Sequence, residues 1–252
     1  MSIDPLITVI TVSYNSESTM ADNIQSVLNQ SYSNIEHLII DGGSSDKTRD
    51  IVVSNNPKAR FLSERDNGIY DAMNKGIRLA KGDYIAILNS DDLYFDETII
   101  KKVMDCFIEH SVDVVYGDMQ FVDPVDSSKV QSTWRAIPYY SKLFKNSEHP
   151  AHPSFFVKKS CYARFGDFKL DFGHTADFEF MMRLLAKEKC TSYVLPEPLV
   201  KMRLGGASDG SFKVLLKNIY NSYRAFKVND QSITPLYFIL RVWIKLKKVI
   251  VK

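Results

Sequence analysis

The sequence contains only three cysteines, Cys106, Cys161 and Cys190, in 252 residues. Their number is odd, the gaps between them are wide and none forms a CxxC pair. This spacing excludes a zinc ribbon and a disulfide-rich scaffold, and it favours a protein of the reducing cytosol. No stretch of about 18 uncharged apolar residues occurs, so we expect no membrane-spanning helix. The N-terminus lacks a basic n-region and turns polar at Tyr14, which indicates a first strand and not a signal peptide.

A strong excess of charge is also missing. The chain has 32 basic and 30 acidic residues and a net charge of +2, too small to indicate a nucleic-acid partner. Hydrophobic residues make up 45% and charged residues 25%, ordinary values that exclude disordered and fibrous classes. This length fits one large domain or two small ones.

Two phosphate-binding motifs are absent as well. The sequence has neither a GxxxxGK[ST] phosphate loop nor a GxGxxG dinucleotide turn. If the chain binds a nucleotide, it must neutralise the phosphates by another means.

Strand and helix patterns alternate over the first 120 residues. We predict strands over 6–13, 35–40, 59–63, 84–88 and 112–116, with amphipathic helices between them. This alternation predicts an α/β fold with a mostly parallel sheet and helices on both faces. Beyond residue 120 the pattern weakens to a strand over 154–157 and helices over 177–186 and 211–226. A polar linker and a helix starting at Thr234-Pro235 follow.

Polar residues stand where the predicted strands end. In an open parallel sheet, ligands bind beyond the carboxyl ends of the strands. Four carboxylates at one edge would repel one another, so a cation or hydrogen-bond donors are needed there. The residues in these loops are Asn15, Asp41, Asp66, Asp91 and Asp92.

The adjacent carboxylates of Asp91 and Asp92 directly follow the fourth predicted strand. Two such groups suit a hard divalent cation, Mg²⁺ or Mn²⁺, which typically bridges one or two carboxylates to substrate phosphates. The alternative is a turn whose solvated acids cap the next helix, and the pair alone does not decide between the two.

Four segments together resemble the signature of the family 2 inverting glycosyltransferases, most closely the bacterial enzymes of capsule and exopolysaccharide assembly. They are VITVSYN at 9–15, IDGGSSDKT at 40–48, ERDNGIYDAMNKG at 64–76 and LNSDD at 88–92. The likeness covers roughly residues 6–205. It implies the GT-A fold, a Rossmann-like α/β architecture, with a nucleotide-diphosphate sugar as donor and usually a divalent metal.

The resemblance also implies roles for the loop residues. Asp41 would accept a hydrogen bond from the base, often uracil, unless it only bonds the backbone of its own turn. Asp66 would lie beside the base or ribose, Asp91 would contact the ribose or the metal, and Asp92 would ligate the metal. Tyr14 and Asn15 would line the base pocket.

The chain departs from the family pattern at Met73, where many relatives have an arginine before the asparagine that matches Asn74. Arg65 or Lys75 would then take over the contact with the diphosphate.

The second half matches the family segment that carries the catalytic base, with Asp177 at the position of that base. A positioned carboxylate takes the proton of the acceptor hydroxyl, an effect of about 10²–10⁴-fold on rate. Alternatively, Asp177 only caps its helix. Glu179 is the rival base, although two residues along a helix place it on another face. His152 is a further candidate, for the diphosphate or the acceptor, beside the alternative of a histidine bonded only to backbone.

The C-terminal segment carries a basic stripe at helical spacing, formed by Arg241, Lys245, Lys248 and Lys252 among apolar residues. Such a helix suits an anionic membrane surface. The alternative is packing against the domain or against a second subunit of a homo-oligomer.

We therefore expect a GT-A domain at 1–227, with a donor half at about 1–120 and an acceptor half at about 121–210, followed by the linker and basic helix at 228–252. The expected enzyme moves a sugar, from a UDP-sugar by preference, to a glycan or lipid-linked acceptor in the cytoplasm or on the inner face of the cell membrane. One alternative is a non-catalytic sugar-nucleotide-binding partner of a polysaccharide assembly complex, which would not need a base. The other is a nucleotidyltransferase, which would favour a glycine-rich basic loop after the first strand.

Overall fold

The computed structural model describes residues 4–205, 212–233 and Tyr237. The predicted basic helix from Thr234 onward lies outside these residues, except for Tyr237. The ring of Tyr237 is fully buried and lies 4.9 Å from that of Phe226. Within the described part of the chain, no helix has the length and apolar character that a membrane crossing requires.

The N-terminal half alternates strands and helices, as the hydrophobic pattern predicts. Buried β-branched runs form the strands, and amphipathic stripes form the helices between them. The elements are β1 (Ile7–Ser13), α1 (Met20–Leu28), β2 (Ile35–Asp41), α2 (Thr48–Asn55), β3 (Arg60–Ser63), α3 (Ile69–Leu79), β4 (Tyr84–Asn89), β5 (Leu93–Tyr94) and α4 (Ile99–His110).

The second half adds strands to the same sheet. It consists of β6 (Val114–Val122), β7 (Val130–Trp134), β8 (Phe155–Lys158), α5 (Lys159–Phe165), α6 (Ala176–Met182), β9 (Ser192–Arg203) and α7 (Phe212–Val228). The strand order is β3-β2-β1-β4-β8-β6-β9-β5, with β7 paired to β6. Pairing is parallel among β1, β2, β3 and β4, as expected, and also between β6 and β9. The other pairs are antiparallel, so the whole sheet is mixed.

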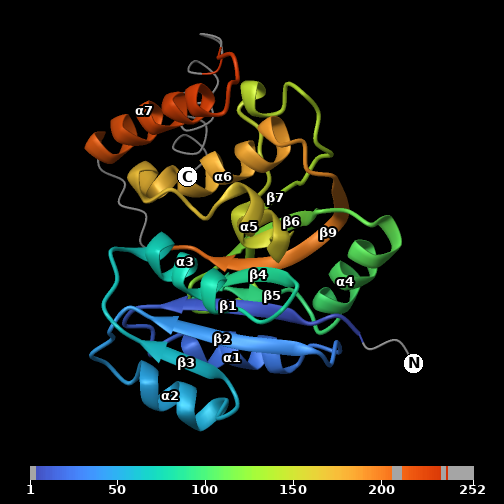
Figure 1. The fold of residues 1–252 in the computed structure, drawn as a ribbon. Coiled ribbons are helices and arrows are strands. Elements are labelled where there is room, and N and C mark those ends of the chain that lie inside the picture. Colours follow the sequence, from blue (N-terminus) through green and yellow to red (C-terminus); the bar gives the residue numbers. More distant parts are fainter. Residues whose placement is uncertain (1–3, 206–211, 234–236, 238–252) are drawn as a thin grey trace.

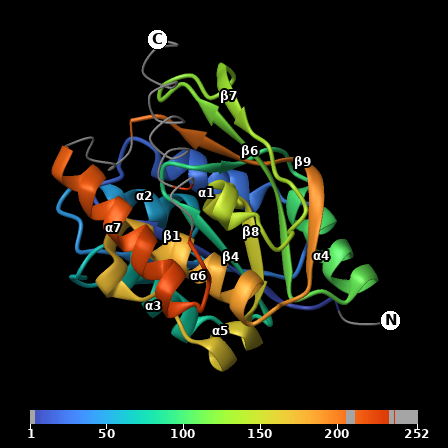
Figure 2. The ribbon, with the colours of Figure 1, turned by 90° about the horizontal axis from the view of Figure 1, so that it is seen from above.

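Helices cover both faces of this sheet. Figure 1 shows α1 and α2 below it and α5, α6 and α7 above it, and Figure 2 shows α7 alongside α6. The period of two along β1 explains how both faces are filled, because Ile10 and Val12 enter the core that holds α3 and α6, whereas Ile7 and Val9 enter the core that holds α4. Gly76 lets α3 approach β1 closely, since a Cβ there would lie 2.4 Å from Cγ2 of Ile10.

Three strands, β5, β7 and β9, and helix α5 were not predicted. The segment of β9 contains Pro196 and Pro198, and proline normally argues against a central strand. The register between β6 and β9 shifts at Gly117 and Asp118, opposite Pro198, so an irregular pairing accommodates the proline. The predicted helix over 177–186 is α6 followed by a π-helical turn, η4, at Arg183–Lys187.

Candidate active site

The carboxylate of Asp41, at the end of β2, is 1% exposed and lies beneath the following loop. It accepts hydrogen bonds from the hydroxyls of Ser13, Ser44 and Ser63 at 3.0, 2.5 and 2.6 Å. The backbone N–H groups of Gly43 and Ser44 also donate to it. Burial acts to raise the pKa of Asp41, but these hydrogen bonds outweigh it and lower the pKa.

The base contact that the resemblance implies for Asp41 stays a prediction, beside the alternative of a residue that bonds only its own loop. A carboxylate offers about four lone-pair sites, and five donors from the protein already occupy them. Asp41 therefore fixes the shape of the loop that follows β2.

Asn15 joins the loop after β1 to the loop after β2. Its backbone N–H donates to Ser44 Oγ at 2.7 Å, and its side-chain oxygen accepts from the N–H of Ser45 at 3.0 Å. Its φ of 48° is in the left-handed region, which asparagine tolerates better than most residues. Next to it, the hydroxyls of Ser16 and Ser90 are 2.7 Å apart, which connects these loops to the turn after β4.

Tyr14 and Asp66 both lie close to Gly42. A Cβ on Gly42 would be 2.5 Å from Oδ2 of Asp66 and 3.4 Å from Cδ2 of Tyr14, so a larger residue there would force the Asp66 carboxylate to move. Oδ1 of Asp66 accepts from the N–H of Gly68 at 2.8 Å. The ring of Tyr14 is 66% exposed, which leaves a face open for stacking. The structure thus brings together two of the predicted donor-binding residues.

The two cations suggested for the diphosphate have different surroundings. Lys75 is held by the carboxylate of Glu64 at 2.9 Å and donates to the backbone oxygen of Arg65 at 2.9 Å. Arg65 is exposed, and its side chain passes close to Gly43. Arg65 is therefore the better placed of the two to reach a ligand.

Asp91 and Asp92 follow β4, as predicted, and Asp92 is fully buried. Asn89 Nδ2 donates to Oδ2 of Asp92 at 3.1 Å. Among the described residues, neither Oδ1 of Asp92 nor Oδ1 of Asn89 has a hydrogen-bond partner. Burial, with a smaller contribution from Asp91, raises the pKa of Asp92 well above its usual range, and burial also raises the pKa of Asp91.

The backbone of this turn is held from both sides. Asn23, buried on α1, donates to the carbonyl oxygens of Asn89 and Asp92, both at 2.8 Å. Arg203, buried at the end of β9, donates to the carbonyl oxygen of Asp91 at 3.1 Å and pairs with Asp22 at 2.6 Å. These contacts fix the turn without using the Oδ1 atom of Asp92.

A divalent cation fits this turn. Buried oxygens that find no partner among the residues described suit a hard cation, and a cation bound here would offset the cost of burying the Asp92 carboxylate. In the described part of the chain, no three His, Cys, Asp or Glu side chains gather around one point. A metal would therefore take few protein ligands and complete its shell with substrate phosphates and water, as Mg²⁺ usually does.

Asp177 lies in the first turn of α6, where the N–H of Phe178 donates to its Oδ1 at 2.8 Å. Burial, followed by the charge of Asp177, raises the pKa of Tyr70 on α3 well above its usual value. His152 lies nearby, with its ring centroid 6.4 Å from that of Tyr70 and 5.5 Å from that of Phe168. Burial lowers the pKa of His152, although the charge of Asp177 opposes this shift. His152 is therefore packed among aromatic rings beside Asp177.

Glu179 has a structural place. Its side chain is fully buried, pairs with Arg183 at 2.8 Å and with Lys169 at 2.9 Å, and accepts from Asn229 at 3.2 Å. Arg183 in turn donates to the carbonyl oxygens of Phe165, Gly166 and Asp167. Since Glu179 is enclosed by this network, Asp177 is the better candidate for a base.

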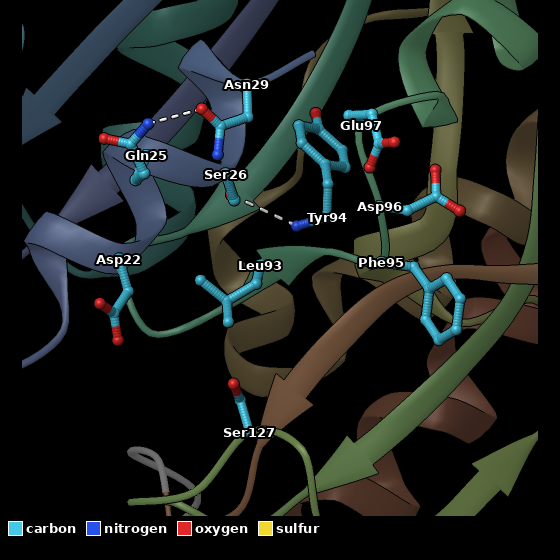
Figure 3. Close-up of a pocket in the computed structure, with 10 residues that line it drawn as sticks. All are labelled: Asp22, Gln25, Ser26, Asn29, Leu93, Tyr94, Phe95, Asp96, Glu97 and Ser127. Atoms are coloured by element: carbon cyan, nitrogen blue, oxygen red, sulfur yellow. Dashed lines mark hydrogen bonds between the residues drawn. The ribbon is translucent and has the colours of Figure 1, made fainter. Parts of the chain in front are cut away.

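A pocket flanks the turn on the side of α1. Figure 3 shows its lining, which comes from α1, from the segment 93–97 and from Ser127. The carboxylates of Asp22, Asp96 and Glu97 are part of this lining and would repel a diphosphate. The pocket is therefore a poor place for the phosphates of a donor.

Sequence reasoning missed Asn23, Tyr70 and Arg203. All three act through contacts with residues distant in the chain; Arg203, for example, bonds residues 112 and 181 positions away. Tyr70 lies inside the family-like segment at 64–76, but its position in that segment did not indicate which residues it contacts. Asn23 carried one usable signal, since a polar residue on the apolar face of α1 needs a partner.

Comparison with known proteins bears on the family and the fold of the chain. The family model described as Glycosyl transferase family 2 matches residues 8–166, more than half of the chain. An uncharacterized glycosyltransferase of Mycobacterium tuberculosis is 32% identical over 188 residues, covering 73% of this chain and 70% of that protein. A PGL/p-HBAD biosynthesis glycosyltransferase of Mycobacterium bovis is 29% identical over 185 residues, covering 71% and 69%.

Two solved structures share the fold. One is Staphylococcus aureus TarS, residues 1–349, in complex with UDP, which superposes with a TM-score of 0.66 at 18% identity. The match covers 89% of this chain and 65% of the TarS 1–349 chain. The other is the mannosyltransferase PcManGT from Pyrobaculum calidifontis, in complex with GDP-Man and Mn²⁺, with a TM-score of 0.65 at 18% identity. The match covers 95% of this chain and 69% of the PcManGT chain. The fold is thus the expected GT-A type, and the chain belongs to glycosyl transferase family 2.

Proposed function

We propose that this enzyme transfers a sugar from a nucleotide-diphosphate sugar, preferentially a UDP-sugar, to a hydroxyl of a glycan or lipid-linked acceptor, with inversion at the anomeric carbon. The observation that carries the proposal is the pair of buried oxygens of Asn89 and Asp92 at the end of β4, for which the described residues offer no hydrogen-bond partner. A divalent cation would satisfy these oxygens, and the phosphates of a donor, with water, would complete its shell.

The donor's base would lie between Tyr14 and Asp66. The exposed ring of Tyr14 offers a stacking face, and Oδ2 of Asp66 offers an acceptor for a base or ribose donor group. Asp41 shapes the loop under this pocket. TarS has been solved with UDP and with UDP-GlcNAc, and PcManGT with GDP-Man, so nucleotide sugars of both base types are known in this fold.

The acceptor hydroxyl would be deprotonated by Asp177. As its oxygen bonds to the anomeric carbon, the bond to the diphosphate oxygen breaks, and the hydroxyl proton moves to the Asp177 carboxylate. Asp92, with Asp91 and Asn89 beside it, would hold Mg²⁺ or Mn²⁺, which when bound stabilises the charge of the departing diphosphate. Arg65, exposed beside Gly43, is the cation placed to assist it.

The test is transfer by Asp177→Asn. A panel of UDP-, GDP- and dTDP-sugars with Mn²⁺ first identifies the donor that stabilises the protein most, and transfer from it to a panel of alkyl glycosides is then measured. We expect the variant to bind the donor within about threefold of the parent, while transfer falls by roughly 10²-fold or more.

Glu179→Gln is the control at the rival position. We expect it to lower the free energy of unfolding by about 3 kcal/mol, because it leaves Arg183 without its buried partner, while the folded fraction keeps its turnover. An active Asp177→Asn beside an inactive, folded Glu179→Gln would show that the base is assigned two positions too early.

A further inference from the structure

The segment 135–140, which follows β7, lies outside any helix or strand, yet two side chains of β6 hold its backbone. The hydroxyl of Tyr116 donates to the carbonyl oxygen of Ile137 at 2.9 Å. The carboxylate of Asp118 accepts from the N–H of Ala136 at 2.7 Å. Because Tyr116 and Asp118 are themselves buried, these hydrogen bonds keep the segment, here called the strap, in one conformation at the surface.

The register of the sheet places the strap near the turn after β4. Val157 of β8 pairs antiparallel with both Ile85 of β4 and Val114 of β6, so β4 and β6 run in the same direction. Four residues beyond these partners, Asn89 and Asp118 stand at the same level of the sheet. Two strand spacings, roughly 10 Å, separate them. The strap is therefore anchored close to the turn proposed to hold the metal.

The strap also lies on the face of the sheet that carries the proposed base. Its anchor Tyr116 packs into the core that holds α3 and α6. Just before the strap, the ring of Trp134 lies 5.0 Å from that of His149, which lies 5.4 Å from that of Phe178. The N–H of Phe178 donates to Asp177. Two ring-to-ring steps thus lead from the start of the strap to the residue beside the base.

The strap presents a fixed guanidinium and an exposed ring. Arg135 pairs with Asp118 at 2.6 Å, and its side chain is 72% exposed whereas that of Asp118 is 3% exposed. The pairing orients the planar fork of N–H donors, and the exposure turns the rest of the fork toward water. The ring of Tyr140 is 38% exposed, and its hydroxyl donates to Glu148 at 2.5 Å. Placed donors beside an aromatic ring suit the hydroxyls and the C–H face of a sugar.

We propose that the strap binds the second sugar of the acceptor, the unit next to the one that is glycosylated, through the guanidinium of Arg135 and the ring of Tyr140. This inference rests on the proposed function, because it places the reacting sugar at Asp177. Two ring-to-ring steps are too far for that sugar and within reach of its neighbour. The carboxylates of Asp118 and Glu148 favour an uncharged sugar over a phosphate here. Since the strap is already ordered, binding does not cost the ordering of a loop.

The test compares acceptors of one and of two sugars. The probes are the octyl glycosides of glucose, galactose and N-acetylglucosamine, and octyl disaccharides that end in the same three sugars. The readout is the acceptor preference, which is kcat/KM for a disaccharide divided by kcat/KM for the matching monosaccharide. The donor is the nucleotide sugar that stabilises the parent most, with Mn²⁺.

The variants are Arg135→Gln, Arg135→Lys and Tyr140→Ala. Arg135→Lys keeps a positive charge beside the buried Asp118, so it guards against a folding defect in Arg135→Gln. Arg78→Gln is the matched control, because Arg78 also pairs with an aspartate, at 3.0 Å, and its side chain is also more than half exposed.

We expect the parent to prefer disaccharides and both Arg135 variants to lower this preference by roughly 10- to 100-fold, the usual effect of losing a hydrogen bond from a charged group. Lysine should not restore it, because an ammonium lacks the planar fork. Tyr140→Ala should lower it by roughly 3- to 10-fold. A purely structural defect would slow transfer to both acceptors alike and leave the preference unchanged. The donor KM should stay within about threefold of the parent, and Arg78→Gln should keep the preference.

Saturation-transfer NMR of the octyl disaccharides measures contact without turnover. We expect saturation on both sugars with the parent and on the terminal sugar alone with Arg135→Gln. A parental preference in both Arg135 variants, or equal saturation of the second sugar, would overturn the inference. Lost donor affinity with an unchanged preference would also overturn it and assign Arg135 to the donor. Transfer that persists in Asp177→Asn would overturn the proposed base, while the saturation of the second sugar still decides the role of the strap.

Discussion

At the scale of single residues, the site depends on side chains whose partners are far apart in sequence. His37 on β2 is one of them, because its ring connects the strands to the turn after β4. Its Nε2 lies 3.0 Å from the Thr11 hydroxyl, which donates to Asn23, and its Nδ1 lies 3.2 Å from Asn56 Nδ2. Since the Thr11 hydroxyl gives its proton to Asn23, its oxygen accepts from Nε2 of His37, and Nδ1 accepts from Asn56. The network therefore requires a neutral His37 ring protonated on Nε2.

The stability of the protein should therefore depend on His37 in acid. Burial lowers the pKa of His37 from 6.5 to about 4. A lowered folded-state pKa means that the unfolded chain binds the proton first, so this stability is complete above pH 6.5 and is lost as the pH falls toward 4. The slope within this window is about 1.4 kcal/mol per pH unit.

Urea unfolding of the parent and of His37→Gln at several pH values measures this slope. We expect the difference in free energy of unfolding between the two proteins to shrink as the pH drops from 6.5 to 4.5, because glutamine does not titrate. A constant difference over that range would show that His37 titrates alike in the folded and unfolded chains.

At the scale of helices and strands, α3 packs on β1 through Gly76. Alanine favours a helix over glycine by about 1 kcal/mol, yet its Cβ at position 76 would lie 2.4 Å from Cγ2 of Ile10. We expect Gly76→Ala to lower the free energy of unfolding by about 1–3 kcal/mol, the usual cost of overpacking. In the double variant with Ile10→Ala, the added methyl group should cost much less, and a thermodynamic cycle of urea unfolding measures the coupling. Strictly additive effects would contradict this contact.

The sequence predicted the helices and strands better than it predicted the contacts between residues that are distant in the chain. The runs that became β1, β2 and β4 were recognisable because buried parallel strands are continuously apolar, and that pattern also predicted which loops share an edge. The pattern failed for β9, where two prolines interrupt a strand that an irregular register accommodates. It could not show that Asp41 points beneath its loop, because three serines from separate segments decide that orientation.

At the scale of the whole molecule, the two halves meet at Tyr70 and Asn74 on one side and at Arg203 on the other. One of the two acceptor classes in the proposed function is a lipid-linked sugar. A peripheral contact of this enzyme with an anionic membrane, through residues 235–252, would serve such an acceptor.

This contact is tested by replacing Arg241, Lys245, Lys248 and Lys252 with glutamine. Truncation at Ser232 would also remove the buried ring of Tyr237, so substitution is the cleaner change. Each basic side chain near an anionic surface contributes about 1 kcal/mol, and salt weakens the contribution. We expect the parent to co-sediment with vesicles of graded phosphatidylserine content at low salt and the variant to bind much less. Equal binding by both, or by neither, would favour a subunit interface, which a change in oligomeric mass would reveal.

The central claim is that the turn after β4 holds a donor through a metal at Asp92. Its most direct measurement is the thermal stabilisation of the parent and of Asp92→Asn by UDP-GlcNAc and GDP-mannose, with Mn²⁺ or with chelator. Asp105→Asn, on the exposed face of α4, is the control. We expect at least one donor to stabilise the parent with Mn²⁺ by about 2.7 kcal/mol at 100 times its Kd, and the Asp92 variant to lose most of that gain. The metal-free variant should be at least as stable as the parent, because asparagine relieves a buried carboxylate whose pKa is raised. Equal donor stabilisation of Asp92→Asn and the parent, with and without chelator, would contradict the account.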